Sequence, residues 1–343
     1  MNHPAKNSEF RGAFVISLDF ELHWGVSANV RNGSHPYWRN LKNTPLAVEQ
    51  MLEVFEQYGI ATTWATVGFL FASNKEERKK FDPKIKPTYA NSELDTYSVN
   101  IGEDVTDDRL HYAPDLMRKI QQVPKQEIAS HTYSHYFCLA EGQDEIMFRA
   151  DLESAKSIAE YHNIDLKTIV FPKNQIHSGY LPILREYGIE VYRGNESGWM
   201  HPKKRKHPSE RASISSIRQK MNRAGRLLDA YVPVAGDNVI DWNEVPDENG
   251  LYNVAASYFL RPWNPRLKNY DNLKLYRIKR AMKKAAKEGK IFHLWWHPHN
   301  FGRFTEENVL FFKNIAEYYQ HLSDKYGMSS LTMYDVAKTL KAE

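Results

Sequence analysis

Two segments of the chain carry side chains that together could bind one metal ion. His131 and His135 lie four residues apart, and this spacing on a helical turn would place both imidazoles on the same face. The apolar run that begins at Phe14 leads into two acids, Asp19 and Glu21. Two imidazoles and one carboxylate are a common ligand set for an open catalytic metal site. These segments therefore indicate an enzyme with a single hydrolytic metal ion.

The acidic segment has the alternation of a β-strand. Asp19, Glu21 and His23 alternate with apolar residues, so an extended chain would direct all three toward one face. We expect these metal-capable groups to emerge together at the end of the strand. The histidine pair also follows a predicted strand, and open α/β folds place their ligands at such strand ends. The alternative interpretation is a chance histidine pair and a solvated acidic loop that bind no metal.

Composition indicates a large, charge-balanced protein. The 343 residues are 42% hydrophobic, which favours a single domain over residues 1–343 rather than several small modules. The net charge of +4 arises from 46 basic and 42 acidic residues and predicts no nucleic-acid partner. The N-terminal residues lack the apolar core of a signal peptide, and no apolar run could cross a bilayer, so we expect a cytoplasmic protein. The single cysteine, Cys138, excludes an intramolecular disulfide.

Helical and extended patterns alternate along the chain. Thr44 as cap, Pro45 in the first turn and Gly59 as terminator predict a helix, and a β-branched run predicts a strand at 60–67. Such alternation implies a parallel sheet with crossover helices, and a (β/α) barrel, complete or incomplete, is the simplest architecture of this kind. Further helices are predicted at 145–163, 180–187, 276–288 and 306–326, and further strands at 14–23, 168–171, 189–192, 290–296 and 328–333.

Two polar segments interrupt the alternation, at about 74–112 and 200–250. We interpret both as insertions at the barrel rim, where long insertions commonly shape substrate clefts. The second contains a basic run at 203–206, which we interpret as a solvated loop rather than a nucleic-acid patch.

Taken in order, these segments resemble the polysaccharide deacetylase family, also called the NodB-homology or carbohydrate esterase 4-like family. Its first motif, a strand ending in acids, is matched by residues 17–21, and its second, a His-x-x-x-His run after Ser or Thr, is closely matched by 130–135. Its third motif, an Arg- and Pro-containing strand end, is loosely matched at 170–175, and its fifth, a strand ending in Leu-His or similar, at 292–297. The resemblance spans residues 13–300 and implies a distorted or incomplete (β/α)7-8 barrel of the NodB-homology type.

The resemblance implies a role for each matched side chain. Asp19 would act as the catalytic base. The metal ligands would be Glu21, His131 and His135, which bind one divalent ion; zinc is favoured, with iron, cobalt, nickel or manganese as alternatives. The converse assignment, with Asp19 on the metal, stays open because one residue separates two acids that are usually adjacent in the motif. His297 would donate a proton to the leaving amine.

One departure from the family pattern concerns the third motif, which lacks its arginine. That arginine normally orients the catalytic aspartate, so another cation must replace it if the mechanism holds. Lys173, Arg193 and Arg261 are the candidates, and Lys173 is the nearest of them in sequence.

Polar and aromatic side chains near the predicted strand ends are candidates for binding sugar. Asn174 and Gln175 could bind sugar hydroxyls, although a polar turn explains them equally well. Tryptophan rings near the motifs could stack on pyranose faces. The predicted substrate-binding residues are Lys173, Asn174, Gln175, Trp199 and Arg261.

The leading hypothesis is metal-dependent hydrolysis that removes an N-acyl group, acetyl or formyl, from an amino sugar or glycan precursor. A role in the synthesis of surface polysaccharide, such as lipopolysaccharide, would fit a cytoplasmic enzyme. A catalytically silent sugar-binding protein is one alternative, favoured by the separated acids and the missing arginine. Hydrolysis of a non-sugar C–N bond, such as that of a cyclic amide, is another. The oligomeric state stays open.

Overall fold

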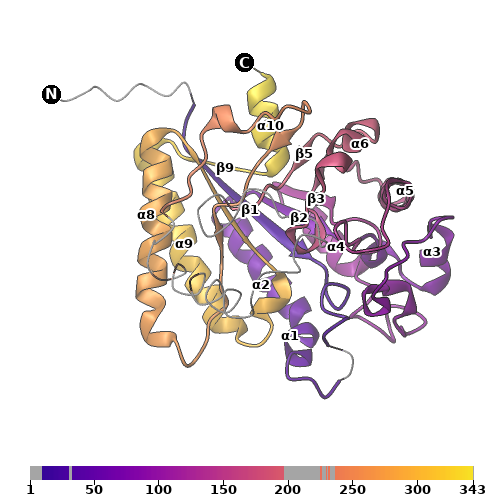
Figure 1. The fold of residues 1–343 in the computed structure, drawn as a ribbon. Coiled ribbons are helices and arrows are strands. Elements are labelled where there is room, and N and C mark those ends of the chain that lie inside the picture. Colours follow the sequence, from indigo (N-terminus) through magenta and orange to yellow (C-terminus); the bar gives the residue numbers. More distant parts are fainter. Residues whose placement is uncertain are drawn as a thin grey trace.

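Short strands and longer helices alternate along a computed structural model that describes residues 10–30, 33–196, 225, 229, 231 and 236–342 (Figure 1). The strands are β1 (Ala13–Phe20), β2 (Thr62–Thr66), β3 (Gln126–Ser130), β4 (Thr168–Ile169), β5 (Val191–Tyr192), β6 (Tyr252–Asn253), β7 (Tyr258–Phe259), β8 (Ile291–Trp296) and β9 (Ser329–Leu331). The helices are α1 (Trp38–Lys42), α2 (Thr44–Gln57), α3 (Lys75–Lys80), α4 (Pro114–Gln122), α5 (Glu145–Tyr161), α6 (Leu181–Glu186), α8 (Asp271–Glu288), α9 (Thr305–Tyr326) and α10 (Met333–Lys341). This order agrees with the predicted α/β class.

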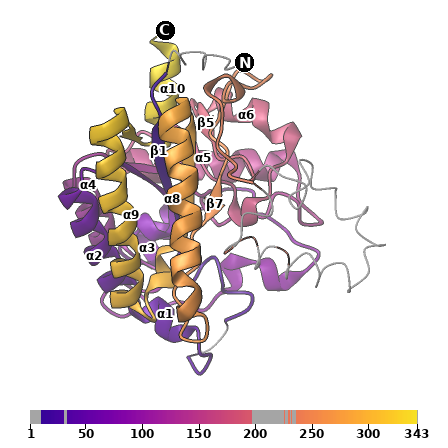
Figure 2. The same ribbon diagram turned by 90° about the vertical axis from the view of Figure 1, so that its left-hand side faces the viewer.

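The strands form one curled, parallel sheet. Their spatial order is β6-β5-β4-β3-β2-β1-β8-β7, and β9 pairs with the first half of β1. Each of these pairs is parallel. Helices cover the outside of the sheet, with α8 and α9 side by side along one wall (Figure 1, Figure 2). The predicted distorted or incomplete (β/α)7-8 barrel is confirmed.

A single crossing of the chain bridges the two ends of the curled sheet. Strands β6 and β7 are the terminal strands of the spatial order, yet only residues 254–257 separate them in sequence. The Val254 amide donates to the Tyr192 carbonyl at 3.0 Å, and the Ser257 amide donates to the His293 carbonyl at 2.9 Å. The crossing therefore bonds to β5 at one end and to β8 at the other.

The central strand β1 carries different side chains on its two faces. Phe14 and Leu18 lie in the main hydrophobic core. Ser17 and Asp19, at alternate positions, both contact Arg193 inside the sheet. All eight residues of the strand are buried. The period-two alternation of the sequence therefore positions a polar pair inside the barrel while apolar side chains anchor the strand to the helices.

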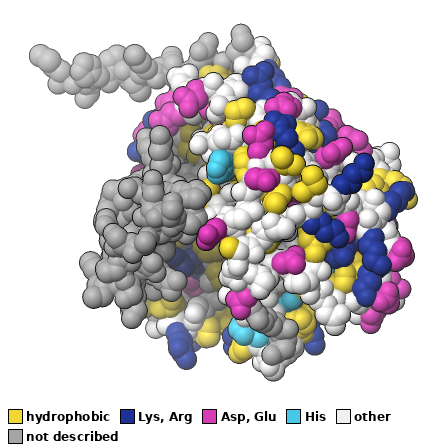
Figure 3. Space-filling view, turned by 45° about the vertical axis from the view of Figure 1, so that its right-hand side comes forward, with side chains coloured by type: hydrophobic (Ala, Val, Ile, Leu, Met, Phe, Trp, Pro, Cys, Tyr) yellow, Lys and Arg dark blue, Asp and Glu magenta, His cyan; other side chains and the backbone are white. Residues whose placement is uncertain are grey.

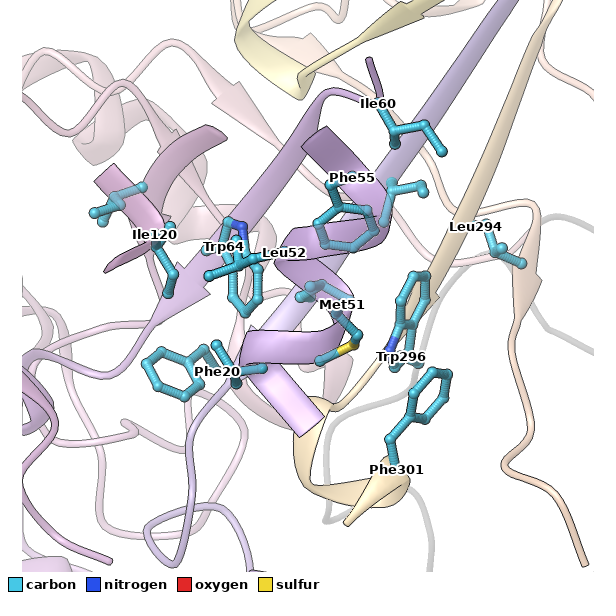
Figure 4. Packing of buried hydrophobic residues seen from close by; sticks show 14 of the residues in the cluster. Phe20, Met51, Leu52, Phe55, Ile60, Trp64, Ile120, Leu294, Trp296 and Phe301 are labelled. Atoms are coloured by element: carbon cyan, nitrogen blue, oxygen red, sulfur yellow. The ribbon is translucent and has the colours of Figure 1, made fainter. Parts of the chain in front are cut away.

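Aromatic packing between α2 and the sheet dominates one part of the core. Figure 4 shows Met51 and Phe55 of α2 between Trp64 of β2 and Trp296 of β8. The Phe55 ring centroid lies 6.2 Å from that of Trp64, 6.5 Å from that of Trp296 and 5.5 Å from that of Phe312. This packing holds β8, β1 and β2 in register beneath the loops that carry the site.

Some boundaries differ from the sequence-based prediction. The first strand ends at Phe20 instead of continuing to residue 23. The last strand ends at Leu331, because α10 begins directly after it with a capping box formed by Thr332 and Asp335. Helix α10 was not among the helices predicted from the sequence.

The segment 74–112 packs against the histidine loop, which we define as residues 131–138. The Thr96 hydroxyl donates to the Ser134 carbonyl at 2.8 Å, and the Phe137 amide donates to the Tyr89 hydroxyl at 3.2 Å. The segment therefore supports one of the motif loops directly.

The surface mixes both signs of charge. On the face seen in Figure 3, basic and acidic side chains are interspersed with apolar ones. Most of the second predicted insertion, including its basic run at 203–206, lies outside the described residues. Among the helices that are described, none is both long enough and apolar enough to span a bilayer.

Replacing Phe55 by alanine tests the aromatic core. We expect the free energy of unfolding to fall by about 3 to 5 kcal/mol, because the large side chain is fully buried and leaves a cavity. Urea denaturation of the variant measures the loss. Leu46→Ala is the matched control on the same helix, since Leu46 is 49% exposed. Equal losses in both variants would contradict this account of the core.

Candidate metal centre

The side chains that could perform chemistry follow different strands and meet at one edge of the sheet. Glu21 follows β1, His131 follows β3, Arg193 follows β5 and His297 follows β8. Since all these strands are parallel, their carboxyl ends lie at the same edge, where enzymes of barrel architecture carry their active sites. The fold therefore gathers residues that are far apart in sequence.

Glu21, His131 and His135 form a buried cluster of potential ligands. One ligand atom from each lies within 4.8 Å of the others. The Glu21 Oε2 atom is 3.0 Å from Nε2 of His135 and 3.3 Å from Nε2 of His131. None of the three side chains is more than 3% exposed. A single cation could contact all three.

The tautomer of His131 favours metal binding. Its Nδ1 atom lies 2.8 Å from the Val170 carbonyl oxygen, which can only accept, so Nδ1 carries the hydrogen and Nε2 of the neutral ring carries a lone pair. No described residue gives this buried Nε2 a hydrogen bond. A second partner that fixes the ring in this way is typical of metal-binding histidines.

Protonation of the second histidine also fits a ligand. Burial lowers the pKa of His135 to about 4, although the neighbouring Glu21 carboxylate raises it in part. For Glu21, burial alone would raise the pKa, yet His297 and the two histidines hold it well below its usual range. The cluster thus presents neutral imidazole and ionised carboxylate, and two nitrogens with one oxygen suit zinc or a similar divalent ion.

The histidine pair does not lie on a helical turn, so that part of the sequence interpretation is wrong. The loop after β3 contains two residues with positive φ, Thr132 at 63° and His135 at 58°, and neither continues a helix. Asp151 of α5 holds the loop: its carboxylate accepts the Tyr133 amide at 2.8 Å, the Ser134 amide at 3.1 Å and the Ser134 hydroxyl. A buried acceptor, rather than helical periodicity, therefore brings the two imidazoles together.

His23 does not join the acids, contrary to the expectation from strand alternation. Leu22 has a φ of 45°, so the chain turns directly after Glu21. The Nε2 atom of His23 lies 2.6 Å from the Val30 carbonyl oxygen, and its Nδ1 atom lies 2.7 Å from Nε2 of His111. Period-two alternation applies only while the chain stays extended.

Gly25 allows the chain to fold back onto the cluster. A Cβ atom at this position would lie 1.9 Å from the Glu21 carboxyl carbon, so any other residue would displace the carboxylate. The Gly25 carbonyl accepts a hydrogen bond from the Lys173 ammonium. No sequence pattern indicates this glycine, because only the turn after Glu21 reveals the close approach.

Arg193 is the one of the three candidate cations that pairs with Asp19. Its Nη1 and Nη2 atoms donate to the two oxygens of Asp19 at 2.6 and 2.8 Å. Both side chains are buried. Burial alone would raise the pKa of Asp19, but the charge of Arg193 together with His131 and His297 holds it below its ordinary value. Asp19 is therefore an ionised, fixed carboxylate beside the ligand cluster.

A hydrogen-bonded chain links the Arg193 guanidinium to the crossing segment. Nδ1 of His293 lies 3.0 Å from the Ala255 carbonyl oxygen and therefore carries hydrogen. Burial lowers the pKa of His293 to about 3, so Nε2 accepts from the Ser17 hydroxyl at 2.8 Å. Ser17 in turn accepts from Nη1 of Arg193 at 2.9 Å. Ser17 and His293 both lie within the quoted motif segments, but the resemblance assigns a role to neither of them.

Two histidines after β8 complete the site. Nε2 of His297 lies 3.7 Å from Oδ2 of Asp19 and 3.6 Å from Oε1 of Glu21, and the side chain is 24% exposed. Nε2 of His299 lies 4.0 Å from the same Glu21 oxygen but is buried, and burial lowers the pKa of His299 to about 3. His297 is therefore the member of the pair that solvent and substrate can reach.

The other predicted substrate-binding residues make different contacts from one another. Asn174 accepts from Nη2 of Arg193 at 2.8 Å, and Gln175 accepts from the Leu139 amide at 3.2 Å. The Arg261 guanidinium lies 5.9 Å from the ring of Phe259, which neighbours His297. Lys173 and Asn174 both have positive φ, at 55° and 52°. Trp199 lies outside the described residues.

This geometry defines a parallel-barrel protein with a Glu–His–His cluster at the carboxyl edge of its strands. Residues 42–192 match the family model named polysaccharide deacetylase. The stretch contains His131 and His135, whereas Asp19, Glu21 and His297 lie outside it. The resemblance stated from the sequence is confirmed. No protein of curated function matches the chain in sequence.

Solved structures share the fold at low sequence identity. A Mycobacterium smegmatis protein described as a polysaccharide deacetylase has a TM-score of 0.60 and 12% identity, covering 99% of this chain and 94% of its own. A Pseudomonas aeruginosa PAO1 protein of the same description has a TM-score of 0.55 and 13% identity, with coverages of 100% and 95%. An allantoinase has a TM-score of 0.52 and 13% identity, with coverages of 100% and 94%. At these identities the likeness concerns the fold alone.

Removing Arg193 tests the buried ion pair. We expect Arg193→Ala to lose about 3 to 5 kcal/mol of unfolding free energy near neutral pH, because Asp19 keeps an unpaired buried charge. Arg193→Lys retains the charge but not the paired hydrogen bonds, so its loss is smaller. Denaturant titrations measure both, and Arg149→Ala, which removes an exposed ion pair with Glu186, is the control with little loss.

Arg193→Ala should also reverse the pH dependence of the stability that Asp19 contributes. In the wild type, the lowered pKa of Asp19 makes its ionisation stabilising above about pH 4, and this contribution is lost as the pH falls through the folded-state pKa. Without Arg193, burial raises the pKa of Asp19, so its contribution is present at low pH and is lost as the pH rises above about 4 toward the raised folded-state pKa. A stability difference between the two proteins that does not grow with pH would refute the assignment.

Removing the Asp151 carboxylate tests the support of the histidine loop. Asp151→Ala leaves two buried amides unpaired, at about 1 to 3 kcal/mol each, and we expect metal affinity to fall about tenfold or more as His135 loses its position. Competition with a chromogenic chelator measures the affinity. Glu153→Ala, at an exposed position of the same helix, is the control, and unchanged metal binding in Asp151→Ala would show that the loop needs no such support.

Proposed function

We propose that this protein is a metal-dependent hydrolase that removes an N-acyl group from an amino sugar. The observation that carries the proposal is the cluster of Glu21, His131 and His135 beside an Asp19 carboxylate fixed by Arg193. The family match and the fold support it. Acetyl and formyl are the acyl groups proposed, and zinc is the ion that the donor set favours.

A divalent ion held by these three ligands would polarise the substrate carbonyl and lower the pKa of a water molecule. The Asp19 carboxylate is the group that accepts the proton of the attacking water. Two observations support this role: Asp19 is ionised, and Arg193 occupies both of its oxygens, which fixes its orientation. The Arg193 charge weakens Asp19 as a base, so the nearby His297 imidazole can take up the proton in turn.

His297 is the proposed donor to the leaving amine. Its Nε2 atom lies within 3.7 Å of both Asp19 and Glu21, and its partial exposure gives it access to substrate. An imidazole can carry a proton on either ring nitrogen, so this side chain is chemically able to donate one. The rings of Trp295 and Phe259 flank His297 at 5.6 and 5.9 Å and limit its rotation.

Two alternatives from the sequence stay testable. Hydrolysis of a cyclic amide gains support from the fold shared with an allantoinase, and the same residues would perform the same proton transfers. A silent sugar-binding protein is disfavoured, because the Asp19–Arg193 pair restores the orientation that the third motif lacks. The cytoplasmic location and a role in lipopolysaccharide synthesis stay predictions.

The proposal is tested by measuring metal content and acyl release together. We expect near-stoichiometric divalent metal in the purified protein, and acetate or formate release from N-acylated amino sugars that a chelator abolishes. His131→Ala should lose bound metal and at least about a hundredfold in turnover. His162→Ala is the matched control, because His162 pairs with Glu77 away from the cluster. Full turnover in His131→Ala would remove the metal from the mechanism, and release from a cyclic amide alone would favour the second candidate.

A further inference from the structure

A pocket with a volume of about 350 Å³ is lined in part by His23, which follows Glu21 of the metal centre by two residues. Its volume falls within the range of about 300 to 1,000 Å³ that is typical of small-molecule sites. The lining residues that matter for its chemistry are His23, Trp38, Glu93, Asp95, Ser98 and Asn100. The pocket therefore forms where the turn after β1, helix α1 and the polar segment 74–112 meet.

The pocket shares a wall with the metal centre. His23 follows Glu21 by two residues, and its ring centroid lies 5.2 Å from that of Trp38. Tyr37 lies on the other side of the same wall: its ring is 5.6 Å from that of His299, and burial together with the Glu21 charge raises its pKa. A chain-like substrate with one unit at the metal centre could place a neighbouring unit in this pocket.

The lining chemistry suits a sugar that carries a positive charge. Trp38 is partly exposed and offers an aromatic surface for a pyranose ring. Ser98 and Asn100 supply hydroxyl and amide groups for hydrogen bonds with sugar hydroxyls. Glu93 and Asp95 add two carboxylates, and the described residues that line the pocket include no lysine or arginine. This combination favours an ammonium group over an anion or a neutral acetamide.

The walls are held in place before any ligand binds. Nδ1 of His111 lies 2.6 Å from Oδ2 of Asp108, and Nε2 of His111 lies 2.7 Å from Nδ1 of His23. The Asp95 carboxylate accepts the Tyr97 amide at 2.9 Å. A pre-formed pocket of this kind loses little conformational entropy on binding.

We propose that this pocket binds an amino-sugar residue with a free ammonium group, next to the acylated residue at the metal centre. The proposal rests on the function proposed above and extends it: the substrate is an oligosaccharide in which an already deacylated residue adjoins the one to be hydrolysed. Trp38 stacks on the sugar ring, and Asp95 with Glu93 pairs with the ammonium.

Direct binding tests the proposal without turnover. The probes are the disaccharide of glucosamine and its fully N-acetylated form, titrated calorimetrically into the intact protein. We expect the free amine to bind more tightly at low salt, with an advantage that shrinks as ionic strength rises. In the double variant Glu93→Gln, Asp95→Asn the advantage should fall by about fivefold, while the acetylated form binds as before. Asn retains the oxygen that accepts the Tyr97 amide.

Tryptophan variants and kinetics separate this proposal from the proposed function. Trp38→Ala should weaken both disaccharides, whereas Trp38→Phe should retain binding, and thermal melts of both variants identify any misfolding. If hydrolysis occurs, the double variant should raise KM for a disaccharide with a free amine and leave turnover of an N-acetylated monosaccharide unchanged. Equal wild-type affinities for the two disaccharides, or an unchanged advantage in the double variant, overturns the pocket assignment even if acyl release is observed. Absence of acyl release alone refutes the hydrolase and leaves the binding result to decide the pocket.

Discussion

The buried ion pair between Asp19 and Arg193 is the interaction on which the site depends. It joins β1 to the end of β5, which lie on different walls of the curled sheet. Both side chains are buried, so neither charge could be left there without the other at low cost. The guanidinium also contacts Asn174 and lies 4.3 Å from the ring of Trp295. The pair therefore fixes the distance between the walls as well as the orientation of the carboxylate.

The ligand cluster depends on loops rather than on regular elements. Glu21 lies beyond the last residue of β1, and its position requires the turn at Leu22 and the bare backbone of Gly25. His131 and His135 lie in a loop held by Asp151 and by the segment 74–112. Such loops hold their ligands only because buried acceptors pair their amides. The strands determine which loops meet, and these local contacts determine how closely.

Much of the fold was predictable because its signals are periodic. The alternation of helical and extended patterns gave the parallel sheet, and polar residues at strand ends indicated the edge where chemistry would lie. Turns that depend on unusual backbone dihedral angles could not be predicted from the sequence. Positive φ at Leu22 and His135 removed His23 from the expected group and replaced the expected helical turn with a loop. No hydrophobic pattern encodes such turns.

The cation that pairs with Asp19 could not be identified from the sequence for a different reason. The sequence offers three candidates, Lys173, Arg193 and Arg261, and gives no basis for choosing among them, because proximity in sequence says little about proximity across a sheet. Lys173, the nearest in sequence, bonds to a backbone carbonyl instead. Only the strand order, which places β5 opposite β1, identifies Arg193. Ser17 and His293 were missed for the same reason, since their link to Arg193 spans three strands.

The crossing between β6 and β7 has a consequence for the edges of the sheet. An unclosed sheet exposes unpaired strand edges that can recruit another chain. Here each terminal strand is only two residues long, and all four amides of residues 254–257 already donate to backbone carbonyls, two of them on β5 and β8. The protein therefore leaves little edge for a second copy to extend, although its barrel does not close by a continuous ladder.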